Sequence, residues 1–201
     1  MAPFCQRERQ ALCDLLVELG PDAPTLCEGW RSADLATHLV LREHRPDAVP
    51  GMLTKRPPFG PWTEHLQKVL EHALGWDDLV QKVRSGPPAI LRRLDPQFNS
   101  VEFFVHYEDL RRAQASWEPR DLAPADEDIL WARARQLARF ARRRPSRLEP
   151  TGRSPISLGG TGPAARARGP AASGPVGELV LWLMGREGVA QVTLTEQQQA
   201  A

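Results

Sequence analysis

Long apolar segments and lysine are both scarce in this sequence of 201 residues. No apolar run approaches the roughly 18–20 residues that a helix needs to cross a bilayer. The amino terminus also lacks a charged segment followed by an apolar stretch and a small-residue cleavage site. Only three of the 26 basic residues are lysine, and the formal net charge is +1. Bulk charge therefore gives no reason to expect a membrane or nucleic-acid partner.

Cysteine is also scarce, with Cys5, Cys13 and Cys27 as the only three. The number is odd, no Cys-x-x-Cys occurs, and the chain is long enough to fold without disulfides. These features predict a reducing compartment, so we expect a cytoplasmic protein. A hydrophobic share of 41% and a charged share of 25% are those of an ordinary soluble domain with a core.

Helical spacing of apolar residues dominates the first part of the chain. Gly-Pro and Arg-Pro pairs end two of the apolar runs, Ser32 is expected to cap the second helix, and five prolines make residues 46–61 an irregular connection. This content predicts a four-helix bundle with one long connection. The predicted helices are 7–19, 32–45, 62–83 and 99–115.

The composition changes after Trp117, and residues beyond Pro145 are rich in Gly, Pro and Ala. We predict a small α+β module here, so that residues 1–124 form the helical bundle and 125–201 form a carboxy-terminal part. Its predicted elements are helices at 127–143 and 175–184 and strands at 154–158 and 189–195. The sequence leaves open whether the protein is a monomer or a homodimer.

A polar stripe lies within the apolar face of the fourth predicted helix. At 100° per residue, Glu102, His106 and Asp109 fall within roughly 80° of Asn99. Apolar residues flank this stripe on both sides, whereas Glu108 is predicted to face solvent. A buried carboxylate beside a buried imidazole is costly unless the two are paired or bind a metal.

Glu102 and His106 are one helical turn apart, so both side chains can reach one ion. His38 on the second predicted helix supplies a third candidate ligand. Three nitrogen and oxygen ligands suit zinc, nickel or iron and leave open positions. Asn99 and Asp109 are expected to orient the ligands. A simple Glu–His hydrogen bond inside the bundle is the alternative interpretation of the same spacing.

Two segments resemble a known family. They are Leu26-Cys-Glu-Gly-Trp-Arg-Ser-Ala-Asp-Leu-Ala-Thr-His38-Leu and Glu102-Phe-Phe-Val-His106. Together they are similar to the DinB-like superfamily, and most to its mycothiol-dependent maleylpyruvate isomerase type from actinobacteria. The likeness covers roughly residues 5–120. A weaker one continues in 174–186, which is similar to the carboxy-terminal module of such proteins.

This resemblance implies a mainly α fold, a DinB-like four-helix bundle with a small C-terminal α+β module. It implies a divalent metal, zinc before nickel or iron, bound by His38, Glu102 and His106. It further implies mycothiol as co-substrate, because a metal-bound thiol is deprotonated and can attack a small electrophile in S-transfer or isomerisation. A non-catalytic metal-binding or regulatory module is the alternative.

Two further features, the arginine stripe and Cys27, each have two interpretations. The arginine stripe from Arg133 to Arg147 could contact nucleic-acid phosphates, but a solvated helix face explains it as well at this near-neutral net charge. Cys27 precedes the second predicted helix and could act as a thiol or an extra ligand, although a small buried hydrophobic role is favoured.

Overall fold

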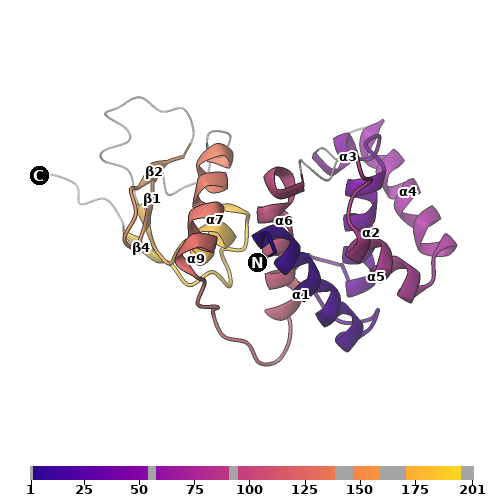
Figure 1. Ribbon diagram of the computed structural model, residues 1–201, viewed down its shortest axis with the longest axis horizontal. Coiled ribbons are helices and arrows are strands. Elements are labelled where there is room, and N and C mark those ends of the chain that lie inside the picture. Colours follow the sequence, from indigo (N-terminus) through magenta and orange to yellow (C-terminus); the bar gives the residue numbers. More distant parts are fainter. Residues whose placement is uncertain (1, 54–57, 91–94, 139–146, 159–170, 196–201) are drawn as a thin grey trace, which may run out of the picture. The chain divides into compact units, whose positions relative to one another are not determined.

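The computed structural model describes residues 2–53, 58–90, 95–138, 147–158 and 171–195. The chain divides into two compact units, Met1–Trp117 and Glu118–Ala201, and each is described by itself. The sequence prediction put the boundary at residues 124/125. The described chain is mainly helical with one small four-stranded sheet, as expected (Figure 1). Within the described residues, every helix falls short of the length and apolar character needed to cross a bilayer.

The first unit is helical throughout its described elements (Figure 1). Helix α1 packs on α5 and α6, α2 packs on α4 and α5, and α3 packs on α4. Their bounds are α1 Phe4–Leu19, α2 Ser32–His44, α3 Val49–Leu53, α4 Phe59–Ala73, α5 Trp76–Ser85 and α6 Asp95–Arg111.

Two parts of this unit differ from the prediction. The continuous helix predicted over 62–83 is two helices, because Leu74 is extended (φ −118°, ψ 136°) and Gly75, also extended, is the N-cap of α5. The connection predicted to be irregular contains α3 and the start of α4. Pro50 and Pro61 lie in the first turns of these helices, where no intrahelical N–H bond is lost.

The expected cap of α2 also differs. Ser32 is the first helical residue, and its hydroxyl donates to Gly20 O and accepts from Ala23 N (3.2 Å). Asp34 accepts the Arg31 N–H instead, at 2.8 Å. The serine therefore ties the loop between α1 and α2 to the end of α1.

One apolar core holds α1, α2, α5 and α6 together. Each helix contributes leucine, valine or phenylalanine side chains that are at most 4% exposed. Burial of this kind contributes about 1.5–3 kcal/mol per large side chain. The core fixes α2 and α6 so that His38 on α2 reaches Glu102 in the polar stripe of α6. Its largest members are Leu12, Leu16, Leu35, Leu39, Leu79, Val83, Phe103 and Leu110.

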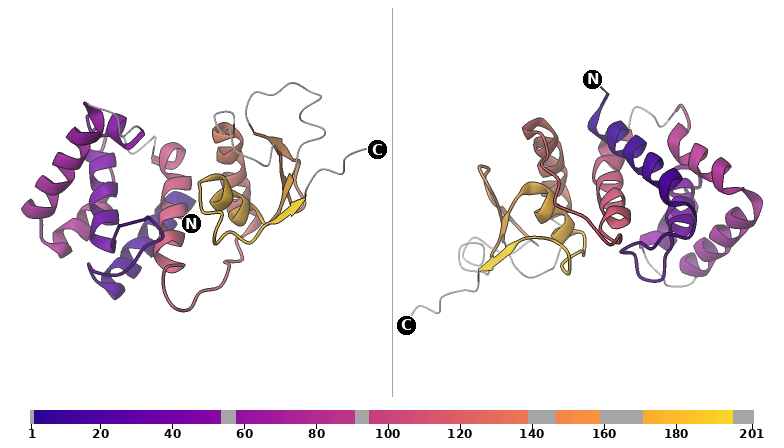
Figure 2. Two further views of the ribbon diagram at one scale, coloured as in Figure 1. Left: turned by 180° about the vertical axis from the view of Figure 1, so that it is seen from behind. Right: turned by 90° about the horizontal axis from the view of Figure 1, so that it is seen from below.

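The second unit is an α+β module, with α7 and α9 on one side of its sheet (Figure 2). The strand order is β2-β1-β3-β4, with β1 and β3 parallel and the outer pairs antiparallel. Strands β1 and β3 were not predicted, because they are short and lack β-branched residues. The elements are α7 Pro124–Leu137, β1 Arg147–Pro150, β2 Ile156–Ser157, β3 Ala171–Gly174, α9 Val176–Leu183 and β4 Thr193–Thr195.

Candidate metal centre

His38 lies in the middle of α2, on the side that meets α6. Its neighbours Leu35 and Leu39 are fully buried in the core, whereas the His38 side chain is 15% exposed. The ring packs against Trp30, with ring centroids 5.1 Å apart. Core packing on one side of α2 and the indole on the other therefore hold the imidazole toward α6.

The polar stripe of α6 presents four side chains, all of which make polar contacts with α2, with the α1–α2 loop or with one another. Asn99, His106 and Asp109 are buried, at 4%, 8% and 0% exposure, and the Glu102 side chain is 19% exposed. Phe103 lies beside the stripe and faces the core. The placement follows from a helix whose polar residues recur every three to four positions inside an apolar face.

The three predicted ligands converge on one point. Glu102 Oε1 lies 3.3 Å from His38 Nε2 and 3.2 Å from His106 Nε2. One donor atom from each residue lies within 4.8 Å of the other two. In a tetrahedral zinc site with bonds of about 2.0–2.1 Å, two donor atoms are about 3.3 Å apart. The residues therefore fit a first-row divalent ion.

Asp109 sets the orientation of the His106 ring. Its Oδ2 lies 2.9 Å from His106 Nδ1, and its side chain is completely buried. If Nδ1 donates its hydrogen to this carboxylate, Nε2 presents its lone pair toward Glu102 and His38. Asp109 thus occupies the orienting position that was expected of it.

The charges of Glu102 and His38 suit a cation, whereas the proton on His106 competes with one. Burial raises the pKa of Glu102, but hydrogen bonds from His106 and His38 and the charge of Arg42 outweigh it, so this pKa lies well below its usual value. Burial lowers the pKa of His38, which keeps this imidazole neutral. Burial also lowers the pKa of His106, but hydrogen bonds with Asp109, Cys27 and Glu102 raise it well above normal.

Asn99 takes part in a network that reaches Glu102 through an arginine. Arg42 donates to Asn99 Oδ1, and its Nε lies 3.3 Å from Glu102 Oε1. Asn99 in turn donates to Glu43 Oε1 at 2.7 Å, and Glu43 forms a bidentate pair with Arg9 at 2.7 and 2.6 Å. Arg42 thus links Asn99 to Glu102, and the orienting role of Asn99 stays a prediction.

The prediction that Glu108 faces solvent was wrong. Glu108 is 0% exposed and binds Arg112 Nε at 2.6 Å and Arg111 Nη1 at 2.9 Å. The Arg112 guanidinium in turn lies 4.5 Å from the ring of Trp117, which covers the pair. The residues after α6 thus bury a face of the helix that the helical pattern alone left open.

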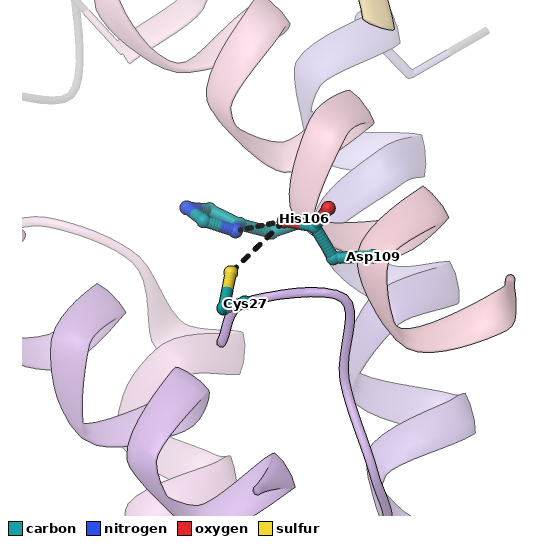
Figure 3. A group of neighbouring side chains, drawn as sticks. All are labelled: Cys27, His106 and Asp109. Carbon is teal, nitrogen blue, oxygen red and sulfur yellow. Dashed lines mark hydrogen bonds and ion pairs between the residues drawn. The ribbon is translucent and has the colours of Figure 1, made fainter. Parts of the chain in front are cut away.

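Cys27 approaches the same site from the loop between α1 and α2. Its Sγ lies 3.3 Å from Asp109 Oδ2, and Cys27, His106 and Asp109 form a second group of neighbouring ligand-type side chains. Figure 3 shows the sulfur and a ring nitrogen of His106 directed at the same carboxylate. Cys27 is therefore a polar contact on the Nδ1 side of the ring, whereas His38 and Glu102 lie on the Nε2 side.

Sequence reasoning missed Arg42 and Glu43. A usable signal was present, because Arg42 follows His38 by four residues and so shares its face of α2. Of the arginine stripe, residues 139 and 142–144 lie outside the described residues. Arg133 contacts Gln136 at 3.3 Å, and Arg147 pairs with Glu149 at 2.6 Å.

Comparison of the chain with protein-family models, with curated proteins and with solved structures finds no match in any of the three.

Proposed function

We propose that this chain is a DinB-like metal-binding protein that holds one divalent ion, zinc before nickel or iron, through His38, Glu102 and His106. The convergence of three donor atoms from two helices carries the proposal. The bundle around them would be the DinB-like four-helix arrangement, with the short α3 and the break between α4 and α5 as local departures from it.

The spacing of the donors suits a shared metal ion. Within one site, His106 Nδ1 and Asp109 are 2.9 Å apart, which is the usual hydrogen-bond length. The contacts of Glu102 with the two Nε2 atoms are longer, at 3.2 and 3.3 Å, and match the edges of a tetrahedron around an ion. The two imidazoles also meet edge to face, with centroids 5.3 Å apart, so both can point at one ion.

The ligand set is typical of a catalytic metal site, in which one coordination position stays open for water or substrate. Three protein ligands leave at least one coordination position, and the side chains of His38, Glu102 and His106 are 15%, 19% and 10% exposed, so solvent reaches them. When bound, the ion would lower the pKa of a coordinated thiol and make it a nucleophile at neutral pH.

Local charge favours an anionic partner at the open coordination position of the ion. One positive charge stays uncompensated when a divalent ion and the Arg42 guanidinium are set against the carboxylates of Glu102 and Asp109. Because Arg42 is 23% exposed and adjoins Glu102, it adds positive potential beside the ligands. A thiolate would neutralise this charge. We therefore propose a low-molecular-weight thiol such as mycothiol as co-substrate, acting on a small electrophile in S-transfer or isomerisation.

Metal analysis tests the binding part of the proposal. Protein purified without a histidine tag should contain one ion per chain, and His106→Ala should lose at least about tenfold in metal affinity. His72→Ala is the matched control, because His72 is exposed on α4 and its Nδ1 contacts Lys68 O at 2.6 Å. Wild-type protein without stoichiometric metal, or equal losses in the two variants, would refute the proposal.

Cobalt substitution tests the thiol part. Mycothiol should change the visible spectrum of the cobalt protein, whereas an analogue without the thiol should not. Consumption of the thiol together with an electrophile would establish an enzyme. A spectrum that responds without turnover would identify a non-catalytic metal-binding or regulatory module, and no response to the thiol would remove it as a co-substrate.

A further inference from the structure

The Asp109 carboxylate, which orients the His106 ring, has a second partner at the same oxygen atom. Oδ2 lies 2.9 Å from His106 Nδ1 and 3.3 Å from Cys27 Sγ. A carboxylate oxygen has two lone pairs, so it can accept from the imidazole N–H and the thiol S–H together. Figure 3 shows both groups approaching the carboxylate from the loop and from the helix. The thiol and the imidazole thus share Asp109 Oδ2 as a partner, besides the hydrogen bond between Cys27 and His106.

The loop holds Cys27 in this place through its backbone. Leu26 N donates to the backbone O of Asp109 at 3.0 Å. The loop backbone is therefore bonded to Asp109, the same residue that the Cys27 side chain contacts. Cys27 O accepts from Trp30 N at 2.9 Å, and the Thr25 hydroxyl accepts from Cys27 N at 3.2 Å. Gly29, with φ of 76°, provides the left-handed turn that this tight loop needs.

The surroundings of Cys27 differ from those of the other two cysteines. Cys5 and Cys13 are 1% and 0% exposed, and Cys13 belongs to the apolar core. Cys27 is only partly buried and contacts a buried carboxylate. A thiol that served only to fill space would not need a charged partner in an otherwise apolar interior.

We propose that Cys27 is a positioning residue of the metal site, acting through Asp109 on His106. The inference rests on the proposed metal site. The S–H donor keeps Asp109 Oδ2 in the plane that receives Nδ1–H, and the ring is thereby held with Nε2 toward Glu102 and His38. Loss of the S–H donor lets the Asp109 carboxylate rotate. The His106 ring is then held less firmly, and the position of its Nε2 atom is less well defined.

Cobalt binding to three cysteine variants tests this role. Cys27→Ala removes the donor and should weaken cobalt affinity about three- to tenfold, which is less than for a direct orienting partner because a thiol is a weak donor. It should also shift the visible bands, which report ligand geometry. Cys27→Ser restores a donor and should recover affinity and bands. Cys13→Ala is the control, because this substitution removes a thiol from the apolar core and should leave the bands unchanged.

The outcomes separate this inference from the proposed function. Wild-type protein without cobalt bands would overturn both. Normal wild-type bands that Cys27→Ala leaves unchanged, with unchanged affinity, would overturn the role of Cys27 alone. A near-ultraviolet sulfur-to-cobalt charge-transfer band that disappears in both Cys27 variants would show that the sulfur is itself a ligand, and would also overturn the positioning role.

Discussion

Removing one partner of the buried ion pair between Arg9 on α1 and Glu43 on α2 should strongly destabilise the first unit. Both side chains are almost fully buried, at 3% and 2% exposure, and they form two hydrogen bonds of 2.7 and 2.6 Å. Arg9 also donates to Val83 O at 2.8 Å and lies 4.0 Å from the Phe103 ring centroid. Replacing Glu43 by leucine leaves this guanidinium without its principal countercharge in the interior.

The expected cost is large. Removing one partner of a buried pair destabilises a protein by about 3–5 kcal/mol, mainly because the remaining charge is uncompensated. If so, Arg9→Met combined with Glu43→Leu should cost clearly less than Glu43→Leu alone, because the double variant leaves no buried charge. With Arg9→Met alone as the fourth member of the cycle, the double-variant cost minus the two single-variant costs gives the coupling energy of the pair.

Urea-dependent hydrogen exchange followed by peptide mass spectrometry can measure this cost. It reports on peptides of α1 and α6 separately from those of the second unit, so the two units need not unfold together. A loss below about 1 kcal/mol for Glu43→Leu would refute the reasoning, as would a double variant at least as unstable as the single one.

Three further outcomes are expected. Asp109→Asn should lower zinc affinity about 10–100-fold in titration calorimetry, and an unchanged affinity would contradict its orienting role. N-ethylmaleimide should label Cys27 before Cys5 and Cys13 in native protein, since burial shields the latter two and raises the pKa of Cys13 to about 12; peptide mapping would expose any other order. Because its pKa is raised, His106 in the metal-free protein stabilises the fold below its unfolded pKa of about 6.5, and this contribution is lost as the pH rises through the folded value. The ion competes with the same proton, so zinc affinity should rise with pH up to that folded value, and a flat profile between about pH 6 and 8 would contradict it.

The clustering of the candidate ligands could be predicted in part because the signal on α6 is local. Glu102 and His106 are one turn apart, and their place inside an apolar face follows from helical period alone. His38 was a candidate because it lies on the second predicted helix near Leu35 and Leu41, and the family resemblance added support. The helices themselves followed from the same periodicity, except at Leu74 and Gly75, where the backbone is extended and α5 begins anew.

The surroundings of the site could not be predicted because they depend on pairs far apart in sequence. Arg9 and Glu43 are 34 positions apart, and Cys27 and Asp109 are 82 apart. Charged residues at such positions resemble solvated surface residues until the partner helix is known. Glu108 illustrates this limit, because its burial depends on residues beyond the end of α6.

A series of polar contacts from Arg9 on α1 to Glu102 on α6 explains how a polar site can lie within this core. Arg9 binds Glu43, Glu43 accepts from Asn99, and Asn99 accepts from Arg42, which adjoins Glu102. Each charge in this series has an opposite charge or an amide as its neighbour, so the desolvation cost of one member is offset by the next. The series is complete without an ion, and Glu102 Oε1 already lies 3.3 and 3.2 Å from the Nε2 atoms of His38 and His106. If the proposed ion binds there, these side chains need little rearrangement, so binding would cost little conformational entropy.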